Sequence, residues 1–162
     1  MSDDEQEKVW EKAESIFKFE SQIGKVFLAN IDFDVYAIPD YRIWQGSDKM
    51  NRLIRKCFIS CMDEASYIYA LDWNHACFRF NPRITYAPEQ PVFAADSRYS
   101  GGGYNIYFPE FYPNGDYYFY ISTDFSWGYL SHPWQKSVFI FGDKLKKQID
   151  IRSKQLGFKR IE

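Results

Sequence analysis

The sequence contains few of the residues from which metal centres and disulfide frameworks are built. Its 162 residues include only two histidines and three cysteines. The cysteines, Cys57, Cys61 and Cys77, do not follow the spacing of a zinc motif, and their odd number does not match a disulfide framework. Because Cys57 and Cys61 stand four residues apart in a predicted helix, we expect both to be small buried apolar residues rather than ligands.

Long apolar runs and an excess of basic residues are also missing. No apolar run approaches the roughly 20 residues of a membrane-spanning helix, and the N-terminus is acidic where a signal peptide would be basic. The net charge of −2 gives no global basic field that would attract nucleic acid. We therefore expect a cytoplasmic protein whose partners include neither membranes nor nucleic acids.

Aromatic residues, in contrast, make up 20% of the chain, so the core must be built from rings more than from aliphatic side chains. The rest of the chain is expected to pack around the stretch from Pro113 to Gly142. It holds a turn at 113–116, an aromatic strand at 117–122 and an apolar strand at 137–142. The polar connection between the two strands contains two tryptophans, and we expect it to be a rigid loop that buries both.

Alternation along the aromatic strand predicts which of its side chains enter the core. Phe119 and Ile121 point to one face of the sheet, and Tyr118 and Tyr120 point to the other. Tyrosine suits a half-buried face, because its ring packs while its hydroxyl stays in water or finds a partner. We predict four core residues on neighbouring strands: Phe119, Ile121, Val138 and Ile140.

The whole pattern predicts an α+β fold in a single domain, residues 1–162. Apolar residues at helical spacing predict an N-terminal, a middle and a C-terminal helix, at 5 to about 17–19, 47 or 48 to about 62, and 143–156. Five or six mostly antiparallel strands are expected within 23–38, 66–72, 77–81, 104–112, 117–122 and 137–142. Asp143 is expected to cap the last helix, and Gly157 to end it in the left-handed conformation.

Two further stretches, a long irregular segment and the basic face of the middle helix, could have a functional role. Residues 82–103 hold three prolines and a glycine triplet, so we expect a mobile or functional loop that proteases cut first. The middle helix has four basic residues opposite its apolar stripe: Lys49, Arg52, Arg55 and Lys56. A solvated helix face is the ordinary explanation for such a set, and an anionic partner is the alternative.

Four motifs occur in order between Leu71 and Gly142. They are L-D-W-N-H at 71–75, P-N-G-D-Y-Y at 113–118, D-F at 124–125, and H-P-W at 132–134 followed by a strand ending F-G. Together they resemble an uncharacterised bacterial family, domain of unknown function 2716, whose members have L-D-W-x-H, P-N/D-G-D-Y-Y, D-F-x-x-G-x-x-G-H-P-W and a strand ending F-G. The chain departs from that pattern at Ser131, where glycine is usual, and carries extra length between the first two motifs. The resemblance implies no activity, because the family has none established.

The candidate site is built around the two histidines, each beside a tryptophan in a predicted polar turn. If the two turns meet at one end of the sheet, two imidazoles and two or three carboxylates come together. Such a set suits a divalent transition metal, with His75 and His132 as its ligands, or a general acid–base pair. The alternative is that these side chains cap turns beneath the tryptophans. The candidate cluster comprises Asp72, Trp73, His75, Asn114, Asp116, Asp124, Trp127, His132 and Trp134.

Two classes of function fit these observations. We favour a protein-binding module of the immunity-protein or antitoxin kind, without a cofactor, because the chain is small, acidic and rich in aromatic residues. Neither a G-x-S-x-G nucleophile motif nor an H-E-x-x-H metal motif occurs in it. The alternative is a small enzyme or metal-binding protein that uses Asp72, His75, Asp116 and His132.

Overall fold

The computed structural model describes residues 2–20, 25–28, 31–40, 43, 48–65, 67–73, 77–84, 108–113 and 115–161. These residues form three long helices, α1 (Asp3–Ile16), α3 (Asp48–Cys61) and α4 (Asp143–Leu156). They also form nine strands: β1 (Phe17–Glu20), β2 (Lys25–Leu28), β3 (Phe33–Ala37), β4 (Ile68–Asp72), β5 (Cys77–Phe80), β6 (Tyr118–Ile121), β7 (Gly128–His132), β8 (Ser137–Phe141) and β9 (Lys159–Arg160).

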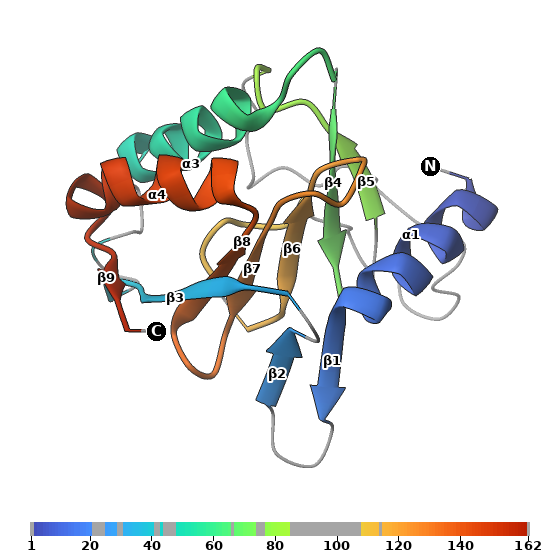
Figure 1. Ribbon diagram of the computed structural model, residues 1–162, viewed down its shortest axis with the longest axis horizontal. Coiled ribbons are helices and arrows are strands. Elements are labelled where there is room, and N and C mark those ends of the chain that lie inside the picture. The colour runs from blue at the N-terminus through green and yellow to red at the C-terminus, as the bar shows by residue number, and fades with distance from the viewer. Residues whose placement is uncertain are drawn as a thin grey trace, which may run out of the picture.

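Seven of these strands form one antiparallel sheet in the order β5-β4-β6-β7-β8-β3-β9 (Figure 1). The remaining two, β1 and β2, form a separate antiparallel hairpin. The α+β fold predicted from the sequence is confirmed, and the sheet is slightly wider than the five or six strands expected. The predicted hairpin of β4 and β5 is also confirmed, with Ile68 opposite Phe80.

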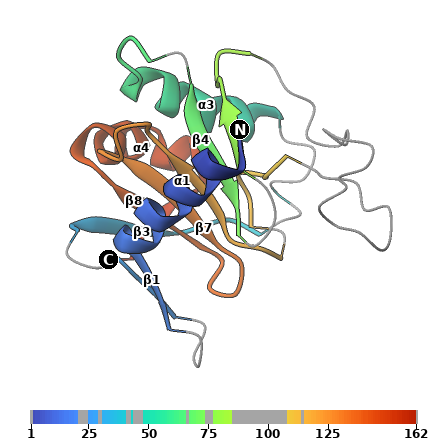
Figure 2. The ribbon, with the colours of Figure 1, turned by 90° about the vertical axis from the view of Figure 1, so that its right-hand side faces the viewer.

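Helices cover both faces of the sheet. Figures 1 and 2 show α3 and α4 on one side and α1 on the other. On the α3–α4 side, the ring of Phe58 from α3 stacks on that of Tyr120 from β6 at 5.4 Å. On the α1 side, the ring of Phe119 meets Trp10 at 5.7 Å and Phe17 at 4.9 Å. The sheet is therefore the middle layer between two aromatic-rich cores.

The side chains of β6 alternate between these cores as the sequence predicts. Phe119 and Ile121 belong to the α1 core, and Tyr118 and Tyr120 belong to the α3–α4 core. The expectation that the tyrosine face is half-buried was wrong, because Tyr120 is completely buried and Tyr118 nearly so. A tyrosine ring is stable there because the Tyr120 hydroxyl donates a hydrogen bond to the backbone carbonyl of Pro109.

The largest correction concerns the connection between the two predicted strands, which contains a strand of its own. β7 pairs with β6 on one side and β8 on the other, so Phe119 and Val138 lie in the core but not on neighbouring strands. The sequence pattern did not predict this strand, because the polar residues Ser131 and His132 are not typical of a buried strand. Both are fully buried in the structure.

Other boundaries differ by a few residues. Helix α1 ends at Ile16, and Phe17 already begins β1. Gly142 is the N-cap of α4 and Asp143 is its first residue, so Asp143 does not cap the helix. Gly157 ends α4 with φ 67°, in the predicted left-handed conformation. Residues 108–112 form no strand, and the rest of the segment predicted at 104–112 lies outside the described residues, as does most of the predicted loop 82–103.

A buried carboxylate ties the C-terminal elements to the sheet. Asp34 of β3 is almost completely buried, and its Oδ1 lies 2.5 Å from a guanidinium nitrogen of Arg160 in β9. The ammonium of Lys146 in α4 is 3.7 Å from the same oxygen and 2.5 Å from the carboxylate of Asp32. This ammonium lowers the pKa of Asp32. Because a buried charge without its partners is costly, these contacts fix α4 and β9 against β3.

Replacing Phe119 by alanine should lower the free energy of unfolding by about 3–5 kcal/mol, since a large ring is deleted from a packed interior. Phe119 is fully buried beneath Trp10 and Phe17. Urea denaturation measures the effect, and Ile84→Ala is the control because that side chain is exposed. A loss below about 1 kcal/mol for Phe119→Ala would contradict this packing.

The two thiols of α3 predict a loss of stability in alkali. Burial raises the pKa of Cys57 to about 11 and that of Cys61 to about 12, from 9.0. Below pH 9.0 both thiols are neutral in the folded and unfolded chain, so their contribution is fully present. As the pH rises toward the folded values, the unfolded chain releases its protons first, and the stability falls.

The urea midpoint should therefore drop as the pH rises from about 9 toward the folded pKa values of about 11 and about 12. Buried tyrosines contribute to the same drop, because burial also raises the pKa of Tyr120 and Tyr129. The drop should be smaller in the double variant Cys57→Ala/Cys61→Ala. An unchanged pH slope in that variant would show that the thiols do not contribute.

Candidate functional site

The predicted cluster divides between the two ends of the sheet. Five of its residues belong to one end, where β4 and β7 finish and β6 and β8 begin: Asp72, Trp73, Asp116, His132 and Trp134. Two belong to the turn between β6 and β7 at the opposite end: Asp124 and Trp127. His75 and Asn114 lie outside the described residues. The structure therefore joins the L-D-W and H-P-W motifs but separates the D-F motif from them.

A row of rings crosses the first end of the sheet. The ring of Tyr117 lies 5.2 Å from that of Trp73 and 4.8 Å from that of His132. The backbone N–H of Trp73 donates to the carbonyl of Tyr117 at 3.2 Å, which connects the end of β4 to the start of β6. The expected meeting of the two motifs thus occurs through Tyr117, which the candidate cluster omitted although it is part of the quoted P-N-G-D-Y-Y motif.

His132 is part of the packed sheet rather than of an open turn. Its side chain is fully buried between Tyr117 and Phe139, and its Nδ1 accepts a hydrogen bond from the backbone N–H of Gln135 at 3.3 Å. This bond helps to close the turn between β7 and β8. Among the residues that the structure describes, no group of three His, Cys, Asp or Glu side chains is placed to hold a metal ion.

The environment of Trp134 is the opposite of what the sequence predicts. It was expected to be buried in a rigid loop, but 74% of its surface is exposed. It lies in the short turn between β7 and β8, in which Lys136 adopts a positive φ of 46°. Burial raises the pKa of the Tyr117 phenol, and a hydrogen bond from the Trp134 side chain opposes this rise. The indole is therefore exposed and yet tied to the ring row.

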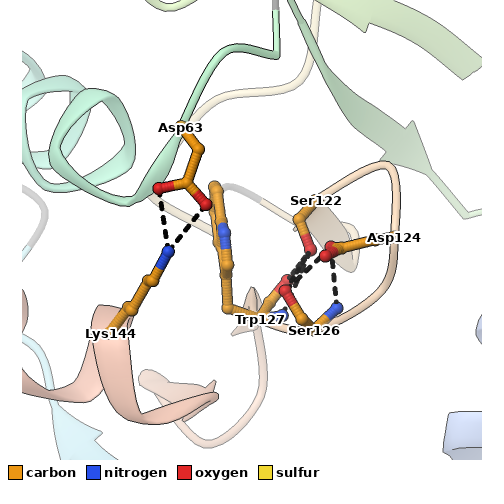
Figure 3. Close-up of polar contacts among 6 residues, drawn as sticks. All are labelled: Asp63, Ser122, Asp124, Ser126, Trp127 and Lys144. Carbon is orange, nitrogen blue, oxygen red and sulfur yellow. Dashed lines mark hydrogen bonds and ion pairs between the residues drawn. The ribbon is translucent and has the colours of Figure 1, made fainter.

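At the other end, the turn between β6 and β7 is held by its own side chains (Figure 3). The carboxylate of Asp124 accepts from the backbone N–H of Ser126 at 3.1 Å and from its hydroxyl at 2.8 Å. Hydrogen bonds from the Ser122 and Ser126 side chains lower the pKa of Asp124. The hydroxyl of Ser122 accepts from the backbone N–H of Trp127 at 3.1 Å. Asp124 thus acts as a turn cap here.

Trp127 anchors this turn to the core. Its indole is almost completely buried and stacks on Phe58 at 5.7 Å. In Figure 3 the indole lies between the turn and an ion pair in which Lys144 Nζ contacts both carboxylate oxygens of Asp63, at 2.7 and 2.8 Å. Both charged side chains are well exposed, so this pair contributes little to stability.

A shallow groove near the same turn was not predicted. Its volume is about 380 Å³, and Val9, Tyr69 and Phe125 contribute apolar surface to it. One charged residue that lines the groove, Glu5, already forms a two-pronged ion pair with Arg79 at 2.7 and 2.8 Å. No sequence signal pointed to this groove, because it is formed where α1 passes over residues distant in the chain.

Comparison with protein families matches residues 1–146 to the family described as "Protein of unknown function (DUF2716)". The chain belongs to this family. The resemblance seen in the sequence between Leu71 and Gly142 is confirmed, and in the DUF2716 fold this stretch runs from the end of β4 to the end of β8.

A curated relative is the "Uncharacterized protein YxiI" of Bacillus subtilis (strain 168). It is 27% identical over 167 residues, which covers 93% of this chain and 90% of the relative. No solved structure matches the chain. Among the described residues of this DUF2716 protein, no helix is long and apolar enough to cross a membrane.

The departure from the motif at Ser131 has a structural role in this chain. The Ser131 hydroxyl lies 3.3 Å from both the backbone nitrogen and the backbone oxygen of Tyr118, the residue opposite it in the sheet. The hydroxyl accepts a hydrogen bond from the backbone N–H of Tyr118 and donates one to its backbone carbonyl. A side chain at this position therefore binds β6 to β7, which a glycine cannot do.

Gly142, the last residue of the F-G motif, should tolerate no side chain. A Cβ there would lie 2.4 Å from the carbonyl oxygen of Ser126, and its φ of 82° is unfavourable for any other residue. Gly142→Ala should therefore destabilise the protein by more than about 2 kcal/mol, measured by thermal unfolding.

Gly157→Ala is the matched control, because Gly157 has a similar φ of 67° but a Cβ there would make only ordinary contacts. That variant should lose about 1 kcal/mol, the cost of the left-handed backbone alone. Equal losses in the two variants would show that the turn between β6 and β7 does not need close contact with Gly142.

Proposed function

We propose that this protein is a protein-binding module and that Trp134 anchors its partner. The observation that carries the proposal is the exposure of Trp134, 74% of a large aromatic side chain in a tight turn. Exposed tryptophans are enriched among the residues that contribute most to protein interfaces.

The surroundings of Trp134 suit a partner surface better than a reaction. The neighbouring His132 is fully buried, and its Nδ1 is engaged by Gln135. The two exposed residues that follow Trp134 in the turn, Gln135 and Lys136, supply polar groups of the kind that surround interface anchors. The finer part of the proposal is that the protein sequesters its partner in the cytoplasm, as immunity proteins and antitoxins do.

The alternative function, an enzyme or metal-binding protein that uses Asp72, His75, Asp116 and His132, stays a prediction. Among the described residues no group of three His, Cys, Asp or Glu side chains is placed to hold a metal ion, and His75 lies outside them. Thermal melts of chelator-treated protein with zinc, nickel or manganese separate it from protein binding. A rise in the melting temperature that is lost in His75→Ala and His132→Ala would favour the metal site over the binding module.

The test of protein binding uses Trp134→Ala. The immobilised protein should capture a stoichiometric partner from an extract of cells that express it, and the purified partner should then bind in calorimetry. Trp134→Ala should weaken binding by about 2–4 kcal/mol without changing the melting temperature, because the side chain is exposed.

Ile84→Ala is the matched control, since it also removes an exposed apolar side chain but lies in a different part of the fold. That variant should bind the partner like the parent protein. Equal partner binding by Trp134→Ala and the parent would remove Trp134 from the interface.

A further inference from the structure

The charges of the helices are segregated across the sheet. α1 has six acidic residues and two basic ones, whereas α3 has four basic and one acidic, and α4 has five basic and two acidic. α1 lies on one side of the sheet and the two basic helices lie together on the other (Figures 1 and 2). The net charge of −2 therefore conceals a molecule with one acidic and one basic helical face.

Some of the basic residues on α3 and α4 are already used within the fold. Lys146 is held by Asp32 and Asp34, Lys144 by Asp63, and Arg55 donates to the carbonyl of Pro82 at 2.9 Å. Four others are exposed and form no ion pair with any residue that the structure describes: Lys49, Lys56, Lys147 and Lys154. Within the described part of the chain, these four lysines therefore have no partner of opposite charge in an ion pair.

On α4, two of the lysines flank an exposed apolar residue. Lys147, Ile151 and Lys154 are spaced by four and three residues, so they follow one another along one face of the helix. Ile151 is 63% exposed, while Leu145 and Ile149 on the other face are fully buried. The outward ridge of α4 thus combines positive charge with an exposed aliphatic side chain.

The two helices differ in how well their dipoles accommodate these lysines. Lys49 is the second residue of α3, where the helix dipole disfavours positive charge, whereas Lys154 lies in the last turn of α4, where the dipole favours it. On α3, Arg52 and Lys56 are like charges four residues apart, which repel each other. The positive charges of α3 are therefore not explained by the stability of that helix.

We propose that the outward faces of α3 and α4 form a second binding surface, which takes an acidic segment of a protein. Carboxylates on the segment would pair with the exposed lysines, and an apolar side chain between them would cover Ile151. Such mixed chemistry fits a protein segment better than a nucleic acid, because a phosphate backbone has no apolar group for Ile151.

This surface is distinct from the turn that holds Trp134. In Figure 1 the turn between β7 and β8 lies at the lower ends of these strands, and α3 and α4 lie above the sheet. The second binding surface therefore does not depend on Trp134. The variant Trp134→Ala distinguishes binding at one surface from binding at the other.

The experiment measures fluorescence anisotropy of the full chain with a labelled peptide in which leucine recurs at every fourth position among glutamates. The parent protein should bind this peptide, and binding should be lost when salt is raised from low concentration to about 0.5 M. Lys147→Glu/Lys154→Glu should weaken binding by at least roughly tenfold, and Trp134→Ala should leave it unchanged.

The matched control is Lys8→Glu/Lys12→Glu on α1, which changes the net charge by the same amount on the acidic face. It should bind within about twofold of the parent protein, and thermal melts should show all variants folded. Three results would overturn the proposal: no binding by the parent, an equal loss in the α1 control, or tighter binding of duplex DNA than of the peptide. Self-association of the parent that is abolished by Lys147→Glu/Lys154→Glu would instead assign the face to a second copy of the chain.

Discussion

The fold depends on the packing of aromatic rings around Phe58. This side chain of α3 is fully buried and meets four other rings, at centroid distances between 5.4 and 5.8 Å: Phe111, Tyr120, Trp127 and Tyr129. They come from β6, β7, the turn between those strands and the segment before β6. Offset and edge-to-face ring pairs are more directional than aliphatic contacts, so this cluster fixes how α3 lies on the sheet.

A core of tyrosines is possible only because each buried hydroxyl has a partner. Tyr120 and Tyr129 donate to the carbonyls of Pro109 and Phe111, the second at 2.8 Å, and Tyr36 donates to the carboxylate of Asp150. Within the described residues no buried side-chain nitrogen or oxygen lacks a hydrogen bond. The segment 108–113 therefore belongs to the core although it forms neither helix nor strand. Its backbone carbonyls accept the hydrogen bonds that the buried tyrosine hydroxyls of the sheet need.

Local patterns predicted the parts of the fold that obey local rules. The alternation of Phe119 with Tyr120 and the left-handed stop at Gly157 depend on neighbours in the sequence, and both are confirmed. β7 was missed because its burial comes from β6 and β8 on either side, which compensates for Ser131 and His132. The same limit applied to the candidate site. Proximity in the sequence placed Trp134 with the buried tryptophans, whereas its exposure depends on the three-dimensional position of the turn.

The order of the strands also affects how the chain reaches its native state. β3 is the first strand of the large sheet along the chain, yet its partners are β8 and β9, with Phe33 opposite Phe141 about a hundred residues later. During synthesis, nearly the whole chain must be made before β3 can pair on either of its edges. Such distant pairing costs loop-closure entropy and slows folding. An emerging chain therefore exposes an unpaired strand, and such strand edges are prone to aggregation until β8 pairs with β3.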